Sequence, residues 1–406
     1  MQRSQLVPGF EATSQRPSPD DVLAVISALE CVQIDPVAAV ERNQHLVLAA
    51  RIPGYRPKLL NQLLETRKVF EYIANAACVL PMADYALVEP IRRRHQTGLQ
   101  SEIDKYQDVV GLVLHRLESE GALPANAFTS ADKVHGYWDN QVAKTKATSH
   151  VLNLLNDTGI IRVVKRDGNT RFFDISRNSL PEDVWQQSRV IETADAQRLL
   201  LEKYMRAYRV LDASDARFGW SHWKAQERSR ILESYVSQGK VVPLAVAECR
   251  TPYYVLAEDV DALQRMEMDL RGDLEPFSDI RVPRSVAVAG RAIRFLPPLD
   301  NLLWRRSRVV DLFSFDYKWE VYTPAVKRQY GYYTMPILAG DELIGRIDPR
   351  LDRKQGALVV EGLYLEPNIK RTQKLSKSLE VALDRFARFH GVNEVVGAHS
   401  AGSADT

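Results

Sequence analysis

The fold is decided in the middle of the chain, where residues 151–175 read VLNLLNDTGIIRVVKRDGNTRFFDI. Apolar residues recur at helical spacing as far as Asp157, and Thr158-Gly159 ends that pattern. Two runs rich in β-branched and aromatic residues follow, at 160–165 and 170–175, and Asp167-Gly168 between them predicts a tight hairpin turn. A helix followed by strand, turn and strand is the layout of a winged helix-turn-helix unit.

The same order of elements recurs on both sides of this stretch. The apolar spacing predicts helices at 103–117 and 142–157 in this copy, and at 194–208 and 222–238 in the next. Strands are expected at 241–247 and 253–257. A weaker copy lies upstream, with helices expected at 19–29, 36–50 and 59–66.

The sequence pattern changes after about residue 281. Short β-rich runs are separated by Gly and Asp turns, and a helix is expected at 374–389; the runs are 285–288, 293–296, 332–338, 342–347 and 358–364. We therefore predict an α+β protein with tandem winged helix-turn-helix units and a C-terminal β-containing unit. The expected segments are 18–98, 99–190, 191–275 and 281–391, with frayed ends at 1–17 and 399–406.

Composition narrows the classes of protein. The 406 residues are 45% hydrophobic, enough to bury several cores, yet no window approaches 18 consecutive apolar residues. The start lacks the apolar core of a signal peptide, so we expect a cytoplasmic protein, associated with the nucleoid when DNA is bound. The three cysteines are far apart and fit no zinc spacing, so we expect reduced thiols, no metal and no cofactor.

Basic residues gather locally although the net charge is only +2. Between 281 and 310 there are seven arginines, including Arg305 and Arg306, against one acid. Such clusters can neutralise phosphates, although each alone is typical of a solvated surface. In a winged helix the last helix enters the major groove and the wing reaches phosphates, so we expect contacts from Lys144, Lys146, Arg162, Arg171, Lys224 and Arg228.

The segment Gln33-Ile34-Asp35-Pro36 is the candidate for chemistry. In an extended chain Gln33 and Asp35 point the same way, and a paired amide and carboxylate can position a water and stabilise a positively charged sugar. The alternative is structural, because Asp before Pro commonly caps a helix. The residues alone leave both roles open, and the two are compatible.

These residues, with Leu46-Val47-Leu48-Ala49-Ala50-Arg51 and Gly54-Tyr55, resemble the catalytic block of the AlkZ/YcaQ DNA glycosylases. The Gln-apolar-Asp form resembles the YcaQ branch. Further similar blocks are Phe70-Glu71-Tyr72, Ala77 to Pro81, Phe295 to Trp304, and Tyr322 to Ile347, which contains Lys327-Arg328. The resemblance spans residues 20–389 and implies that Arg51, Lys327 and Arg328 contact DNA.

The resemblance implies a monofunctional glycosylase that acts as a monomer on alkylated or crosslinked double-stranded DNA. It would hydrolyse the N-glycosidic bond of N7-alkylated purines and unhook interstrand crosslinks, with Asp35 activating water and Gln33 holding it. One departure is Asn75-Ala76, where the YcaQ pattern has His-Glu, so Asn75 is a possible site-lining residue. A non-catalytic winged-helix regulator or lesion sensor, or a protein-interaction scaffold, are the alternatives.

Overall fold

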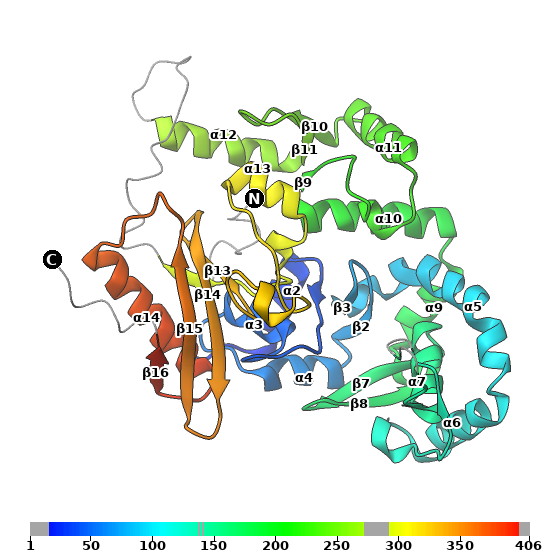
Figure 1. Cartoon of the computed structure of the whole chain (residues 1–406). Coiled ribbons are helices and arrows are strands. Elements are labelled where there is room, and N and C mark those ends of the chain that lie inside the picture. The colour runs from blue at the N-terminus through cyan, green and yellow to red at the C-terminus, as the bar shows by residue number, and fades with distance from the viewer. Residues whose placement is uncertain (1–15, 137–138, 140–141, 272–291, 398–406) are drawn as a thin grey trace. The chain divides into compact units, whose positions relative to one another are not determined.

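The computed structural model describes residues 16–136, 139, 142–271 and 292–397. The chain forms two compact units (Figure 1). In the described residues, unit 2 contains 18–32 and 57–203, and unit 1 contains 33–56 and 204–397. The expected division into four segments stays a prediction. The expected frayed ends and the run 285–288 lie outside the described residues, apart from Arg16 and Pro17.

Unit 2 begins with two helices and a hairpin. Helix α2 spans Pro19–Ala28 and α4 spans Pro57–Glu65; strands β2 (Val69–Ile73) and β3 (Ala77–Pro81) pair antiparallel. Ser18 and Asp21 cap α2 reciprocally, each side chain bonding to the main chain of the other. The 3-10 helix η1 (Met82–Val88) leads into α5 (Glu89–Asp104).

The expected winged unit follows in the same part of the chain. Helices α6 (Gln107–Glu120) and α7 (Ala147–Asp157) precede the hairpin of β7 (Ile161–Asp167) and β8 (Thr170–Ile175), and β4 (Leu123–Pro124) adds a third strand. A core of nine buried residues, among them Val113, Val151 and Phe173, joins these elements. Helix α7 starts five residues later than expected, because 145–146 form strand β6 with β5 (Lys133–Val134).

The rest of unit 2 is helical. Helices α8 (Ser176–Ser179), α9 (Glu182–Val190) and α10 (Thr193–Tyr208) follow the wing, and α10 continues into unit 1. Lys203 on α10 is 1% exposed, and its ammonium pairs with Glu30 at 2.8 Å and Asp84 at 2.7 Å. The two carboxylates offset the cost of burying this charge.

Unit 1 contains a second three-stranded sheet. Strands β9 (Val210–Leu211), β11 (Tyr253–Leu256) and β10 (Val241–Leu244) pair in that order, with α11 (Ala225–Ser237) before them in the chain and α12 (Ala257–Arg271) after β11. The pattern of helix and hairpin agrees with the expectation for 194–257. The helix predicted at 222–238 is observed as α11, which begins later in the chain than predicted.

A five-stranded sheet dominates the C-terminal part of unit 1 (Figure 1). Its order is β12 (Ile293–Phe295), β13 (Met335–Ala339), β14 (Glu342–Asp352), β15 (Ala357–Leu365) and β16 (Glu394–Gly397), antiparallel except for β15 with β16. Helix α14 (Gln373–Phe389) buries Leu375, Leu379 and Leu383 in the core of this sheet. The 3-10 helices η4 (Asn301–Leu303) and η5 (Ala325–Lys327) and helix α13 (Arg306–Phe313) lie between β12 and β13 in the chain.

The N-terminal segment of unit 1 packs into the same core. Val40, and Leu46 on helix α3 (Asn43–Ala49), are each 1% exposed and belong to the cluster formed by the sheet and α14. This packing fixes residues 33–49 against the sheet although 244 or more positions separate them in sequence. Among the described residues, no helix combines the length and apolar character needed to cross a lipid bilayer.

Candidate functional site

Asp35 lies in an irregular turn after the short strand β1 (Val32–Gln33). Its Oδ1 accepts a hydrogen bond from the Val37 main-chain N–H at 2.8 Å. The helix expected at 36–50 is present only from Asn43, so Asp35 caps a turn instead of a helix. The physical reason is tertiary: Val40 enters the sheet core, and the Ala39 carbonyl accepts from Leu351 N–H, which holds this segment out of helical geometry.

The Asn43 side chain ties the Asp35 turn to the rest of unit 1. Its amide nitrogen donates to the main-chain carbonyl of Gln33 at 2.8 Å, and its amide oxygen accepts from Leu299 N–H at 3.2 Å. Gln33 itself is 8% exposed. The two predicted catalytic residues are thus held in a fixed stretch of main chain, with Gln33 nearly covered and Asp35 half-buried.

The charge of Asp35 is not offset by a neighbouring cation. Burial raises the pKa of this carboxyl group, and the Val37 N–H opposes the rise. Among the described residues, none forms an ion pair with Asp35. Burial raises the pKa of the Tyr333 phenol, and interactions with Tyr317 and then Asp35 raise it further.

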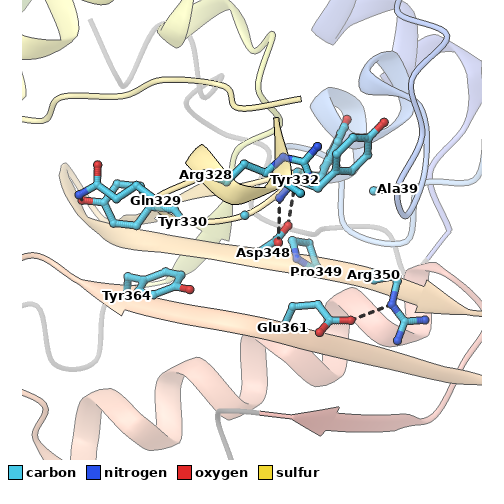
Figure 2. Close-up of a pocket in the computed structure, with 13 residues that line it drawn as sticks. Ala39, Arg328, Gln329, Tyr330, Tyr332, Asp348, Pro349, Arg350, Glu361 and Tyr364 are labelled. Carbon is cyan, nitrogen blue, oxygen red and sulfur yellow. Dashed lines mark hydrogen bonds and ion pairs between the residues drawn. The ribbon is translucent and has the colours of Figure 1, made fainter. Parts of the chain in front are cut away.

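Tyr333 also lines a cavity of about 670 Å³, which we call the tyrosine hollow (Figure 2). Its lining comes from the loop before β13, from the hairpin β14–β15 and from the Asp35 segment: Ala39, Ala325, Arg328, Gln329, Tyr330, Gly331, Tyr332, Tyr333, Asp348, Pro349, Arg350, Glu361 and Tyr364. Asp35 is four residues from Ala39. Asp35 is not itself a lining residue, and because it belongs to the same chain segment as Ala39 we treat the hollow and the carboxylate as one candidate site.

Two carboxylates fix the wall of the tyrosine hollow. Glu320 accepts hydrogen bonds from the main-chain N–H groups of 329, 330 and 331 at 2.8, 2.8 and 3.2 Å. Asp348 accepts from those of Tyr332 and Tyr333 at 3.0 and 2.8 Å (Figure 2). Although burial opposes ionisation, the three N–H donors hold the pKa of Glu320 below its usual value. Gly331 has φ of 136°, and any side chain there would collide with Asp348.

Cations and aromatic rings alternate along this wall. The Arg328 guanidinium lies 4.9 Å from the centroid of the Tyr332 ring, and Arg346 lies 4.1 Å from that of Tyr330. Across the hollow Arg350 pairs with Glu361 at 2.8 Å (Figure 2). Beside it, Tyr322 is 82% and Val326 is 93% exposed. Arg346 is 4% exposed and paired with Glu366, so the flat rings and the Arg328 guanidinium are the parts of this wall that suit the bases and phosphates of a nucleic acid.

The predicted phosphate contacts divide into two groups. Exposed side chains with access to solvent are Lys144, Lys146, Lys224 and Lys327, whereas Arg328 is half-buried and its Nε donates to the Thr323 carbonyl at 2.9 Å. Lys146 is the residue before α7, and Lys144 lies earlier still, so neither is in the first turn of that helix as expected. Direct contact with phosphate stays a prediction for all five.

The other group is engaged with internal partners. Arg51 is 4% exposed and holds Asp300 through both guanidinium nitrogens, at 2.7 and 2.9 Å. Arg162 is also 4% exposed and donates to the Ser179 carbonyl at 2.8 Å, and burial lowers its pKa to about 10. Both guanidinium groups are engaged inside the protein, and contact of either arginine with phosphate stays a prediction that this burial does not favour.

Four further arginines have part of their donors occupied. Arg305 forms a bidentate pair with Asp212, and Arg306 donates to the Pro298 carbonyl. Arg171 donates to Asn153, and Arg228 donates to the carbonyls of Ala213 and Trp223; all four side chains are half-buried. Their distribution along the sequence gave no sign of these partners.

Asn75 lies in the turn between β2 and β3 of unit 2, whereas Gln33 and Asp35 belong to unit 1. It is half-buried, and its main-chain N–H faces the sulfur of the buried Cys78. Its role toward substrate stays a prediction. Within the described residues, no three His, Cys, Asp or Glu side chains gather to form a metal site.

Sequence reasoning missed most of the tyrosine hollow. The aromatic and basic run 327–332 contained its signal, because alternating rings and cations are typical of nucleic-acid surfaces. Glu320, which fixes that run together with Asp348, stood out in no pattern.

Comparison with known proteins identifies the family of the chain. The family model described as "DNA glycosylase AlkZ-like" matches residues 26–389. The fold is similar to that of the Streptomyces sahachiroi DNA glycosylase AlkZ, with a TM-score of 0.59 and 17% identity over 98% of this chain and 97% of the other. The mixed helix-and-sheet fold and the family resemblance predicted from sequence are both confirmed. The chain belongs to the AlkZ-like family and is a DNA glycosylase.

Proposed function

We propose that this glycosylase hydrolyses the N-glycosidic bond of N7-alkylated purines in duplex DNA, including purines joined in interstrand crosslinks. The observation that supports it most directly is Asp35, a half-buried carboxylate without an ion-pair partner among the described residues, four residues before Ala39, which lines a hollow of rings and cations. Alkylation at N7 makes the purine cationic and a good leaving group. The enzyme then has to stabilise the sugar cation and deliver water, and needs no acid for the base.

The geometry gives the two oxygens of Asp35 different tasks. Oδ1 is held by the Val37 N–H, which fixes the carboxylate plane. No described residue donates a hydrogen bond to Oδ2, so this oxygen is available to orient and deprotonate water. Because burial raises the pKa of Asp35, the carboxylate is a stronger base than an exposed aspartate, and its negative charge offsets the developing oxocarbenium ion.

A crosslinked base is tied to the opposite strand and cannot swing out of the stack, so full base flipping does not suit that substrate. The cations of the candidate surface, including Lys327 and Arg328, would hold the duplex by its phosphates instead. No lysine lines the tyrosine hollow, which favours hydrolysis without a covalent amine intermediate. We propose a monomer that needs no cofactor.

The decisive experiment measures base release from duplex DNA that contains 7-methylguanine, and from a duplex with an N7–N7 crosslink. Abasic sites are revealed by alkali, and borohydride trapping tests for an amine intermediate. We expect release by the wild-type protein, strong loss in Asp35→Asn, and partial loss in Gln33→Ala. Release at the wild-type rate by Asp35→Asn would contradict the assignment, and DNA binding without release would indicate a lesion sensor.

A further inference from the structure

Unit 1 contains a second cavity, of about 590 Å³, which none of the proposed chemistry uses. It lies between α14, strand β12 and the residues that follow α3. We call it the arginine pocket, and its main lining residues are Arg56, Arg294, Phe295, Arg385, Arg388 and Phe389. Cavities of 300–1,000 Å³ are typical of sites for small molecules.

The positive charge of this pocket is left without a counterpart. Asp and Glu are missing from its described lining. Arg51 also lines it, but that charge is balanced by the buried Asp300. Arg294 and Arg385 form no ion pair with any described residue. Because acids usually accompany arginines that are partly buried, two such groups together indicate a site for an anion.

The guanidinium groups of Arg294 and Arg385 line the same pocket, and their like charges repel each other. Burial lowers the pKa of Arg294, and the charge of Arg385 lowers it further. Burial also lowers the pKa of Arg385, whose Nη2 donates to the main-chain carbonyl of Ile293. That bond anchors Arg385 next to β12, the strand that carries Arg294. An oxyanion between the two groups would replace their repulsion with attraction.

Aromatic rings supply the rest of the pocket. Phe295 and Phe386 pack edge to face with centroids 5.4 Å apart, and Phe389 stacks on Tyr55 at 6.3 Å. Val381, on the same helix, is 59% exposed and lines the pocket. The pocket therefore combines a cationic end with apolar surfaces, and its volume exceeds the needs of an inorganic ion.

We propose that the arginine pocket binds the phosphate group of a nucleotide, with Arg294 and Arg385 donating to the phosphate oxygens and Phe295 and Phe389 contacting the organic part. Guanidinium groups match phosphate with paired hydrogen bonds, which favours phosphate over a single halide or a neutral ligand. The phosphate could come from a DNA strand or from a free nucleotide. The first source rests on the proposed function, and the second does not depend on it.

The test measures binding of 2′-deoxyguanosine 5′-monophosphate and of inorganic phosphate by calorimetry and by the shift in melting temperature. The Arg294→Gln/Arg385→Gln double variant is compared with Arg250→Gln, which removes an exposed arginine of the same unit outside the pocket. Circular dichroism establishes that each variant folds. Deoxyguanosine without phosphate is the ligand control, and all proteins carry Asp35→Asn, so that base release plays no part.

We expect the nucleotide and phosphate to bind and to raise the melting temperature, and the double variant to bind about tenfold or more weakly. The Arg294→Lys/Arg385→Lys variant should retain part of the binding, since it keeps the charge but loses the paired donors. Arg250→Gln should bind as the wild type does. Equal binding by the double variant, or equal binding of deoxyguanosine, would overturn the proposal, as would no binding of phosphate or nucleotide.

Competition with duplex DNA separates the two sources. If the pocket takes a strand phosphate, saturating duplex displaces the nucleotide, and the double variant lowers the salt dependence of DNA binding by about one unit for each phosphate that it no longer neutralises. If it takes a free nucleotide, the duplex and the nucleotide bind together. Both results support the phosphate site, and neither depends on whether Asp35 is catalytic.

Discussion

Asp35 and Asp300 of unit 1 make the same main-chain hydrogen bond but differ in burial and in their charged partners. Each carboxylate accepts the main-chain N–H two residues ahead, Asp35 from Val37 at 2.8 Å and Asp300 from Leu302 at 3.0 Å. Asp300 is fully buried and paired with Arg51, whereas Asp35 is half-buried and has no such partner among the described residues. The local turn therefore does not decide the role of an aspartate. The presence or absence of a neighbouring cation decides it, because an ion pair neutralises the negative charge that catalysis would need.

The strongest test of this contrast is Asp35→Asn. Asparagine keeps an oxygen for the Val37 N–H but loses the charge, so we expect base release to fall about 10²- to 10⁴-fold. Burial raises the pKa of Asp35 in the folded protein, so its ionisation opposes folding above that pKa, and the variant should melt at the same or a higher temperature at pH 7. Single-turnover assays and calorimetric melting measure the two effects.

The wild-type activity should also depend on pH in a defined direction. Base release requires ionised Asp35, so it is lost as pH falls through the raised pKa, at higher pH than for an exposed aspartate. The single-turnover rate against pH measures this limb. A melting temperature that drops sharply in Asp35→Asn would show instead that the carboxylate is structural.

Asp300→Asn should give the reverse pattern. It leaves the Arg51 charge buried and unpaired, so we expect the free energy of unfolding to fall by about 3–5 kcal/mol. Urea unfolding at pH 7 measures the loss, and an Arg51→Met/Asp300→Leu variant should recover part of it. Loss of activity in Asp300→Asn without loss of stability would contradict the structural role assigned to Asp300.

A half-buried histidine tests whether unpaired charge is avoided elsewhere in unit 1. His390 packs against Phe386 and Phe389, and burial, with the charge of Arg353, lowers its pKa to about 4. The unfolded chain takes up this proton near pH 6.5, so stability is full above that pH and is lost as pH falls toward 4, by up to about 3 kcal/mol. His390→Phe should flatten the loss, as followed by urea unfolding between pH 7 and 4; an unchanged profile would contradict the shift.

The smallest effect is expected for exposed cations. Lys327→Gln should weaken duplex binding several-fold and lower the salt dependence by about one unit, with unchanged stability. Arg51→Gln is the matched opposite, because its guanidinium serves Asp300 and should affect stability and not the salt slope. Fluorescence anisotropy across a salt series distinguishes the two, and equal slopes for Lys327→Gln and the wild type would remove Lys327 from the DNA surface.

Local chemistry made part of the fold predictable. The wing at 161–175 and helix α14 match the expected ranges within one or two residues, because a glycine turn and an apolar stripe fix them locally. Residues 36–42 of the helix expected at 36–50 are not helical, because long-range contacts of Val40 with the sheet core prevail over local spacing. The parallel pairing of β16 with β15 could not be predicted from the sequence either, because it depends on the packing of α14.

The candidate site was predictable in its residues and not in its environment. Asp35 was identified from a three-residue motif and the family resemblance. Its lack of a counter-charge, and the hollow beside it, depend on residues around 39, 320–333 and 348–364. The surroundings of Arg51 were hidden for the same reason: Arg51 and Asp300 are 249 positions apart, so the sequence could not show that this guanidinium is internal.

The ordered wall of the tyrosine hollow has a thermodynamic consequence. Three main-chain N–H groups bonded to Glu320 and two bonded to Asp348 account for every residue from 329 to 333. The conformational entropy of this loop is therefore lost when the protein folds and, if DNA binds here as proposed, not at the binding step. Association at this surface should occur by near-rigid docking, with a recognition step whose speed is set by encounter and not by rearrangement of the loop.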